Sequence, residues 1–583
     1  MKSPRSVSTG AADAKRDKWP WLVMVYMAGD NCLTEEMVLS LQDIMQSGAP
    51  HGGIVVAQLD PGGTGIATQR YAFSVPPPEP RSPRPAPLPP HLEDYRDRTF
   101  DGLEGNTGSR ESLMEFVRWA WEKRAGRPMR TLLILSGHGS GTTEDFFLKD
   151  ETPADSLTFE ELAETFEELH GGKDPIAIDV LGLDACYMCM GELAYELREH
   201  VGILIGPEGL EPSFGWPYRR ILSKVRLHEG AMDDKALATL IVHEYVEHYA
   251  DYDRAAGRSA DLAALRLQKM DDVKRKFAAL VEALPRSKAG HEKVVLAHWY
   301  AQTYKADQFV DLKDLCDRLR KLFPGRGRVG RACEAVIGAL RSCVIHARCS
   351  GFATQFSHGV SIYFPWAMVS PDYWQRPFAR HTGWAHYLKE HLEATQRKPR
   401  RAELLPKTTP VTQLLERAGL NEKSADAKGD TIRHRIVSKL DARLGVVPAG
   451  KPSPAEMAEE AIVRRLRCLL DIADTPQLRH ALLRTAKRVD AGNIPAVDIP
   501  NALARRFFRS RYTERSKYTG RSKYTERSKH TEHSKYTERS KYTERSKYTE
   551  RSKYTERSKY ADRLRSTADR ETWVKNLPAV FFL

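Results

Sequence analysis

The amino-acid sequence predicts an α/β fold, in which helices cover both faces of a mostly parallel β-sheet. Short, continuous apolar runs recur between residues 19 and 205 and have the pattern of strands that are buried on both faces. Segments with helical periodicity separate these runs, so strands and helices alternate along the chain. Hydrophobic residues make up 41% of the sequence, which is enough to fill a substantial core.

The apolar runs end at small or polar residues, and these ends place the predicted elements. The predicted strands span residues 21–27, 53–59, 130–136, 175–183 and 201–205. The predicted helices span residues 109–124, 157–169 and 191–199, and later elements are a mainly helical stretch at 230–350, a strand at 360–364 and an aromatic-rich helix within 372–394. The second helix is capped near Ser156 or Thr158. Residues 76–90 are rich in proline, so we expect a surface loop there.

Composition divides the chain into six parts. They are a flexible N-terminus at 1–18, an α/β domain at 19–395, a basic linker at 396–410, a helical accessory domain at 411–508, a low-complexity tail at 509–562 and a C-terminal segment at 563–583. The tail repeats the hexapeptide Tyr-Thr-Glu-Arg-Ser-Lys. A six-residue period matches neither a helix nor a strand, so no continuous apolar stripe forms and we expect the tail to be disordered.

Charge and cysteine content narrow the class of protein. The net charge is +13 and the pI is near 9.2, but much of the excess lies in the repeat tail. We therefore expect the charges of the tail to be exposed to water. Nucleic-acid binding, in which tail tyrosines would stack on bases, is the less favoured hypothesis. The eight cysteines have no regular spacing, which favours reduced thiols. With no transmembrane segment and no secretion signal visible, we expect a cytoplasmic protein with no membrane partner.

Two of the predicted strands end in reactive side chains. Residues 135–141 read Leu-Ser-Gly-His-Gly-Ser-Gly and present His138, and residues 181–191 present Cys186. The carboxyl ends of parallel strands lie at one edge of a sheet, so these side chains can meet there. A thiol beside an imidazole is a nucleophile and base pair suited to acyl transfer, most simply peptide hydrolysis. The N–H groups of Gly139 and Cys186 would form the oxyanion hole.

These motifs resemble the clostripain family of cysteine peptidases, in the caspase-like clan. The resemblance covers roughly residues 20–392 and is carried by 23–31, 134–141, Asp184-Ala-Cys-Tyr-Met, 192–196, 206–218 and 357–365. It implies a caspase-like α/β/α sandwich, with His138 as general base and Cys186 as nucleophile of an endopeptidase. It also implies protein or peptide substrates with Arg or Lys before the scissile bond (the P1 residue), and it places Asp184 in the pocket for that side chain.

The resemblance leaves three points open. Glu208 and Glu211 both follow the fifth strand, and the sequence does not say which of them, if either, helps to form the P1 pocket. Relatives can depend on calcium, yet the chain has no EF-hand-like loop, so we place no metal site. Relatives also mature by cleavage shortly after the catalytic histidine, and Lys149, in an expected loop at 144–151, is the candidate self-cleavage position.

Other readings of the same residues remain. Cys186 and Cys189 form a Cys-x-x-Cys pair, which a redox or zinc role would use, although core packing is the expected role of Cys189. His358 is expected to be structural. The alternative function is a catalytically inactive caspase-like scaffold that acts through protein contacts, with 411–508 as the segment that binds a protein partner.

Overall fold

The computed structural model describes residues 19–491 with internal gaps. The gaps are residues 64–65, 74–90, 101–104, 144–146, 153, 229–231, 257–258, 305–307, 326, 352, 367, 397–407, 427–434, 437–438, 441–452 and 473–475. The N-terminal segment, the proline-rich loop, most of the linker, the repeat tail and the C-terminal segment lie outside the described residues.

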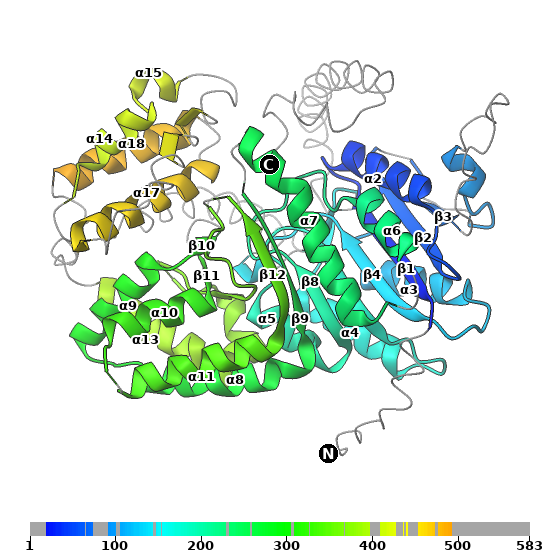
Figure 1. Cartoon of the computed structure of the whole chain (residues 1–583), viewed down its shortest axis with the longest axis horizontal. Helices are drawn as coiled ribbons and strands as arrows, with labels where there is room; N and C mark the ends of the chain where they lie inside the picture. The colour runs from blue at the N-terminus through cyan, green and yellow to red at the C-terminus, as the bar shows by residue number, and fades with distance from the viewer. Residues whose placement is uncertain are drawn as a thin grey trace, which may run out of the picture.

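An eight-stranded sheet forms the centre of the molecule, in the order β12-β9-β8-β7-β4-β1-β2-β3 (Figure 1). Its strands are β1 (Trp21–Gly29), β2 (Ile54–Pro61), β3 (Gln69–Phe73), β4 (Arg130–Ser136), β7 (Ile178–Asp184), β8 (Val201–Gly206), β9 (Ala260–Arg266) and β12 (Val344–Ser350). The five strands from β8 to β2 in this order pair in parallel, whereas β3, β9 and β12 pair antiparallel. The predicted α/β fold with a mostly parallel sheet is confirmed.

Helices cover both faces of this sheet, which explains why the central strands are apolar along their whole length. Every residue of β1, β4 and β7 is buried. One face packs against α2 (Thr34–Ser47), α6 (Tyr218–Leu227) and α7 (Asp234–Ala256), and the other face against α3 (Arg110–Glu122), α4 (Phe159–Gly171), α5 (Gly191–Glu196), α8 (Met270–Ala283) and α11 (Arg328–Cys343). The result is a three-layered α/β/α sandwich. Thr158 caps α4 through a capping box with Glu161, which settles the predicted cap.

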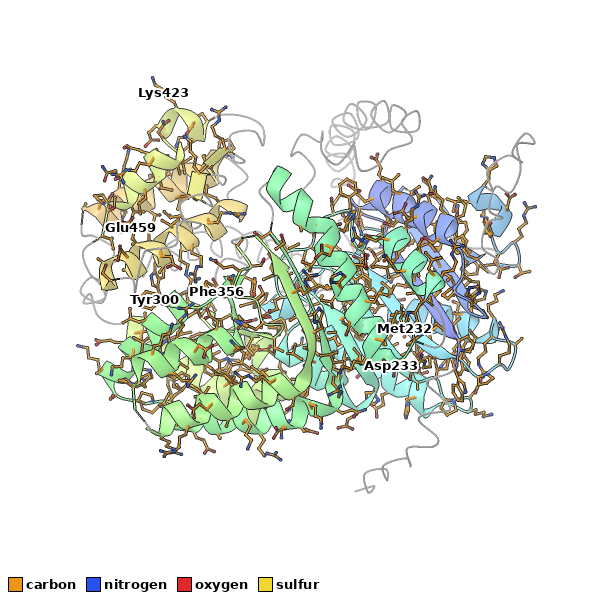
Figure 2. The ribbon with its side chains drawn as sticks, viewed as in Figure 1. Met232, Asp233, Tyr300, Phe356, Lys423 and Glu459 are labelled. Atoms are coloured by element: carbon orange, nitrogen blue, oxygen red, sulfur yellow. The ribbon has the colours of Figure 1, made fainter. Side chains whose placement is uncertain are left out.

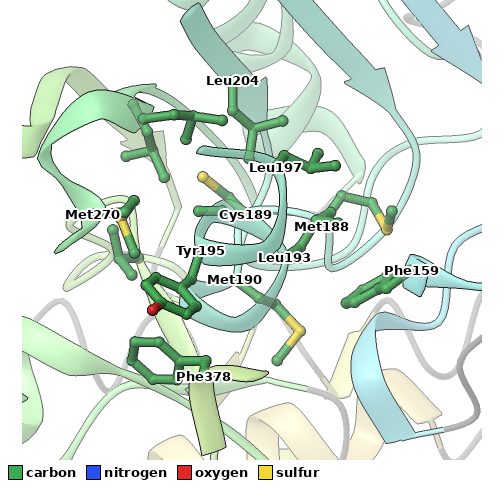
Figure 3. Close-up of a cluster of buried hydrophobic side chains, with 14 of the residues drawn as sticks. Phe159, Met188, Cys189, Met190, Leu193, Tyr195, Leu197, Leu204, Met270 and Phe378 are labelled. Atoms are coloured by element: carbon green, nitrogen blue, oxygen red, sulfur yellow. The ribbon is translucent and has the colours of Figure 1, made fainter. Parts of the chain in front are cut away.

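The segment after β7 passes directly into the core. Figure 3 shows Met188, Cys189 and Met190 packed with Leu193 and Tyr195 of α5. Cys189 is completely buried, and its thiol donates to the carbonyl oxygen of Gly359 at 3.0 Å. Burial raises the pKa of this thiol well above its usual value. The expected packing role of Cys189 is confirmed.

The prediction of mainly helical structure for residues 230–350 is wrong in part. Strands β9 and β12 extend the sheet from this region. The sequence of β9, Ala-Asp-Leu-Ala-Ala-Leu-Arg, has helix-forming residues, and pairing with β8 overrides that local preference. The predicted late strand at 360–364 is confirmed as β13 (Ser361–Tyr363), in a second sheet with β10 (Thr303–Tyr304) and β11 (Phe309–Asp311).

The C-terminal helices share a hydrophobic core with the α/β part. They are α14 (Val411–Ala418), α15 (Glu422–Ala425), α17 (Pro454–Ile472) and α18 (Pro476–Asp490). Their core includes Trp366 and Trp299, the latter from α9 (Lys288–Tyr300). Arg465 of α17 donates to the carbonyl oxygens of His298 and Trp299, at 2.5 and 2.7 Å, and so caps the end of α9.

Figure 2 shows Tyr300 and Phe356 at the boundary between these helices and the α/β part, with Lys423 of α15 far from it. Arg464 of α17 donates to the carbonyl oxygen of Tyr300 at 3.4 Å and lies 4.6 Å from the ring centre of Phe356. The helices predicted from residue 411 onward are therefore anchored by two neighbouring arginines. Within the described part of the chain, no helix is apolar and long enough to cross a membrane.

Candidate active site

His138 and Cys186 occupy equivalent positions beyond neighbouring parallel strands. β4 and β7 pair so that Ser136 lies opposite Asp184, the last residue of each strand. His138 and Cys186 therefore each lie two residues past the end of their strand. Because both turns leave the same edge of the sheet, the fold brings the two predicted reactive residues to one place.

The two turns are in direct contact. The N–H of Gly137 donates to the carbonyl oxygen of Asp184 at 3.2 Å. A side chain at Gly139 would put its Cβ 2.6 Å from the carbonyl oxygen of Cys186, closer than atoms can approach. Glycine is therefore required at position 139 by the packing of one turn on the other. The proposed oxyanion donors, the N–H groups of Gly139 and Cys186, lie on these touching turns, and their assignment stays a prediction.

Cys186 is held in a strained turn. Its neighbour Tyr187 has φ of +62°, a left-handed conformation that is uncommon for a large side chain, and the N–H of Tyr187 donates to Gly209 at 2.9 Å. The half-buried Cys186 sulfur accepts a hydrogen bond from the N–H of Glu211 at 3.2 Å, which favours the thiolate. The next helix, α5, begins only at Gly191, so the Cys186 thiol does not lie at a helix N-terminus.

His138 is half-buried, and its pKa depends on its burial and on the charges of Lys149 and Glu151. Burial lowers the pKa of His138, and the positive charge of Lys149 lowers it further. The imidazole is therefore held in its neutral form near pH 7, as a general base requires. Its Nε2 lies 3.3 Å from the sulfur of Cys32, a residue that the sequence analysis did not single out.

Lys149 lies on a strand rather than in the expected loop. Strand β5 (Phe147–Asp150) pairs antiparallel with β6 (Asp155–Leu157), and the N–H of Leu148 donates to the carbonyl oxygen of His138 at 2.9 Å. The Lys149 side chain is exposed, whereas the next residue, Asp150, is completely buried. The loop prediction failed because this four-residue strand is too short to leave a periodic pattern.

Asp184 and Glu211 form a buried acidic pair beside Cys186. Asp184 Oδ2 accepts hydrogen bonds from Ser136 at 2.9 Å and from Tyr218 at 2.7 Å. Within the described residues, Asp184 Oδ1 and both carboxylate oxygens of Glu211 are buried without a hydrogen-bond partner of good geometry. Burial raises the pKa of Asp184, and burial together with the charge of Asp184 raises that of Glu211 well above its usual value.

Glu208, the other acidic candidate, faces away from this pair and holds the structure together. Its Oε1 accepts from the N–H of Gly359, and burial raises its pKa well above the usual value. Asp261 of β9 accepts from the N–H groups of Glu208 and Gly209, at 2.7 and 3.1 Å, and so fixes the start of the loop that carries Glu211. Of the two glutamates, Glu211 is the one whose N–H contacts Cys186 and whose carboxyl lies beside Asp184.

His358 has the structural role that we expected. Its N–H donates to Asp311 Oδ2 at 2.6 Å, and its Nδ1 lies 3.2 Å from Asp311 Oδ1. Burial lowers the pKa of His358, but the hydrogen bond and charge of Asp311 outweigh burial, and the net shift is upward. This pair ties the segment before β13 to the end of β11.

The described residues do not fit a calcium site. No group of three or more His, Cys, Asp or Glu side chains among them has the arrangement of a metal centre. The carboxylates of Asp60 and Asp150 are near each other, but they accept hydrogen bonds from Thr68 and from the N–H of Thr107, each at 2.7 Å. Burial also raises the pKa of Asp60 to about 7, so this carboxyl is a poor ligand for a cation near neutral pH.

The sequence of this chain matches a known protein family over about half of its length. The family model described as Peptidase C11, clostripain family, matches residues 98–394. Clostripain of Hathewaya histolytica is 24% identical over 270 residues, which are 38% of this chain and 50% of that relative. The chain thus spans about half the length of the curated relative that it matches.

Two solved structures of C11 proteases are similar to 63% of this chain. A secreted C11 cysteine protease from Bacteroides thetaiotaomicron, in complex with an irreversible peptide inhibitor, has a TM-score of 0.48 and 15% identity, over 63% of this chain and 99% of that chain. An inactive zymogen C11 protease from Parabacteroides distasonis has a TM-score of 0.44 and 16% identity, over 63% and 98%.

The charges beside His138 predict opposite shifts for two matched variants. Lys149→Gln removes the positive charge that disfavours the imidazolium, so the pKa of His138 should rise. Glu151→Gln removes the negative charge that favours the imidazolium, so the pKa should fall. Both shifts should be modest, because the Lys149 and Glu151 side chains are 49% and 56% exposed and water screens them. NMR titration of His138 in a Cys186→Ala background measures both, and a shift in the same direction for both variants would contradict this electrostatic account.

Proposed function

Because the chain belongs to the clostripain family, we propose that it is a cysteine endopeptidase that cleaves after Arg or Lys through a Cys186–His138 dyad. The observation that supports this proposal best is the buried acidic pair. Asp184 and Glu211 lie on the two segments that meet at the Cys186 sulfur, and three of their four oxygens make no well-aligned hydrogen bond among the described residues, although the two carboxyls interact with each other. Such a pair needs a cationic group with several donors, and a P1 guanidinium or ammonium supplies one.

In the proposed reaction, His138 takes and gives a proton once during acylation and once more during deacylation, when the released Cys186 thiolate recovers its proton. The imidazole takes the proton of the Cys186 thiol, and the thiolate sulfur bonds to the carbonyl carbon of the scissile peptide. The resulting oxyanion is stabilised by N–H donors on the touching turns of Gly139 and Cys186. When the tetrahedral species collapses, the C–N bond breaks and His138 gives its proton to the leaving amine, which leaves a thioester on Cys186. Water, deprotonated by His138, then hydrolyses the thioester and releases the acid.

The acidic pair also explains how the P1 side chain contributes to binding. Two carboxyl groups at close range, both buried, do not ionise together easily, so the free enzyme keeps a proton on the pair to higher pH than an isolated carboxyl would. A cationic side chain entering beside Cys186 favours the ionised form of both. Binding of a basic P1 residue is therefore coupled to release of a proton from Asp184 and Glu211, whereas a neutral residue leaves that proton on the pair.

Removing either member of the dyad should abolish hydrolysis. Cys186→Ala and His138→Ala should each reduce turnover to the background rate, because nucleophile and base act as one unit. Cys189→Ala is the matched control from the same Cys-x-x-Cys pair, and the folded variant should retain most activity, because Cys189 lies in the core. Hydrolysis of a fluorogenic Arg peptide measures all three. An active Cys186→Ala enzyme together with an inactive Cys189→Ala enzyme would show that the nucleophile is assigned to the wrong cysteine.

Isosteric changes in the acidic pair should alter specificity rather than folding. Asp184→Asn and Glu211→Gln should each lower kcat/KM for Arg and Lys peptides by about one to two decades, since a buried charge-assisted contact contributes about 1.5–3 kcal/mol. Thermal stability should be unchanged or higher, because a buried carboxyl without a full set of partners destabilises the free enzyme. A screen over P1 residues measures the change. An unaltered P1 profile in both variants would remove this pair from substrate recognition.

Self-processing after Lys149 is the remaining part of the proposal. The peptide bond after Lys149 joins it to Asp150, which is buried and whose carboxylate accepts a hydrogen bond from the N–H of Thr107. Strand β5 must therefore separate from β6 before this peptide bond can be cleaved. Incubated wild-type protein should slowly yield fragments that end at Lys149, and Cys186→Ala and Lys149→Gln should not. Mass spectrometry of the fragments tests this. A wild-type chain that hydrolyses Arg peptides yet stays uncut at Lys149 would exclude this site.

A further inference from the structure

We propose that Cys32 is a positioning residue for His138, which makes the site an ordered series Cys32–His138–Cys186 rather than a dyad. This inference rests on the proposed function, because it concerns the base of the same reaction. In the proposal, the Cys32 sulfur accepts a hydrogen bond from Nε2–H of His138. The proton is thereby kept on Nε2, and Nδ1 is left to take the proton of the Cys186 thiol.

The proposal rests on a contact between two turns that follow neighbouring strands. Cys32 Sγ lies 3.3 Å from His138 Nε2. Cys32 follows β1, which pairs in parallel with β4 on the side opposite β7. The edge of the sheet therefore presents Cys32, His138 and Cys186 after the strands β1, β4 and β7 in their spatial order. His138 follows the middle strand, and a cysteine follows each of the two neighbouring strands.

The turn that carries Cys32 is fixed on both sides of the cysteine. The Asn31 side chain donates to the carbonyl oxygens of Ala28 and Lys149, each at 2.8 Å. Its Oδ1 accepts from the N–H of Leu33 at 3.0 Å. The turn is thereby tied to β1 and to β5, which is itself bonded to the backbone of His138. Cys32 is exposed, so the defined place of its sulfur comes from this turn and not from packing in the core.

Only one tautomer of the neutral imidazole suits general-base catalysis here. Of the two ring nitrogens, one carries the proton and the other has a lone pair. If Nε2 carries the proton and donates it to Cys32, then Nδ1 can accept from Cys186. When Nδ1 is protonated, the ring becomes an imidazolium, and its Nε2–H still points at the Cys32 sulfur. No bond to Cys32 forms or breaks during the cycle, so its role is to orient the base.

The surroundings of the two cysteines separate their roles. The Cys186 sulfur accepts the N–H of Glu211 and lies beside the acidic pair that we assign to the P1 side chain. The turn of Cys32 is instead bonded to β1 and β5, on the other side of His138. A substrate whose P1 residue reaches Asp184 therefore presents its scissile carbonyl to Cys186.

The test compares Cys32→Ala with Cys32→Ser in the full-length chain. Cys349→Ala is the matched control, because Cys349 is a half-buried reduced cysteine on β12, away from His138. We expect Cys32→Ala to lower kcat about three- to tenfold with KM unchanged, the loss of one neutral hydrogen bond. The Ser variant should recover most of the loss, because its hydroxyl accepts from Nε2–H. The melting temperatures of both variants should stay as close to wild type as that of Cys349→Ala.

A second readout does not depend on turnover. ¹⁵N NMR of His138 in a Cys186→Ala background should show that the neutral ring carries its proton on Nε2. Adding Cys32→Ala, with Lys149 and Glu151 unchanged, should give a mixture of the two tautomers. Wild-type kcat and an unchanged tautomer in Cys32→Ala would overturn the proposal, as would equal losses in the Ala and Ser variants with a lowered melting temperature. A chain with no peptidase activity would refute the proposed function, and the tautomer measurement would still decide the role of Cys32.

Discussion

The parallel pairing of β4 with β7 is the constraint on which the site depends. Its register places Ser136 opposite Asp184, and the proposed dyad and oxyanion donors lie within a few residues of that pair in the sequence. Ser136 donates to the Asp184 carboxylate, while the turns that follow carry His138 and Cys186. A shift of one residue in this pairing would turn Asp184 to the other face of the sheet and separate the two turns. The helices on both faces stabilise the register by burying every residue of both strands.

The same site contains unfavourable electrostatics. Asp184 and Glu211 are buried close together, with oxygens that make no well-aligned hydrogen bond among the described residues, and such groups destabilise a fold unless they are protonated or paired. The surrounding structure keeps them in place. Asp261 binds the start of the Glu211 loop, and Gly215, with φ of +64°, passes so close to Asp184 that a Cβ there would lie 2.7 Å from its Oδ1. A rigid frame around unpaired carboxyl groups is typical of a preorganised binding site.

Sequence patterns predicted the strands that matter and missed what depends on their order in space. The apolar run at 130–136 matches β4 residue for residue, and the reactive residue after it was found for the same reason. The sequence did not indicate a role for Cys32, because it is an exposed residue in a turn. It contacts His138 because β1 lies next to β4 in the sheet. Local sequence does not encode that neighbourhood. Glu208 and Glu211 were indistinguishable for a similar reason, since the hydrogen bonds of the folded loop decide which carboxylate faces Asp184.

Covalent labelling measures the central claim most directly. A peptide that ends in arginine and carries an electrophilic ketone should form a thioether with the nucleophile when its P1 side chain is bound, and peptide mapping by mass spectrometry then identifies the labelled cysteine. We predict that the arginine peptide labels Cys186 in the wild type and labels the Asp184→Asn variant only weakly. The equivalent norleucine peptide should label neither the wild type nor this variant efficiently. Labelling of Cys32 in place of Cys186, or equal labelling by the arginine and norleucine peptides, would contradict the assignment of the nucleophile or of the acidic pair.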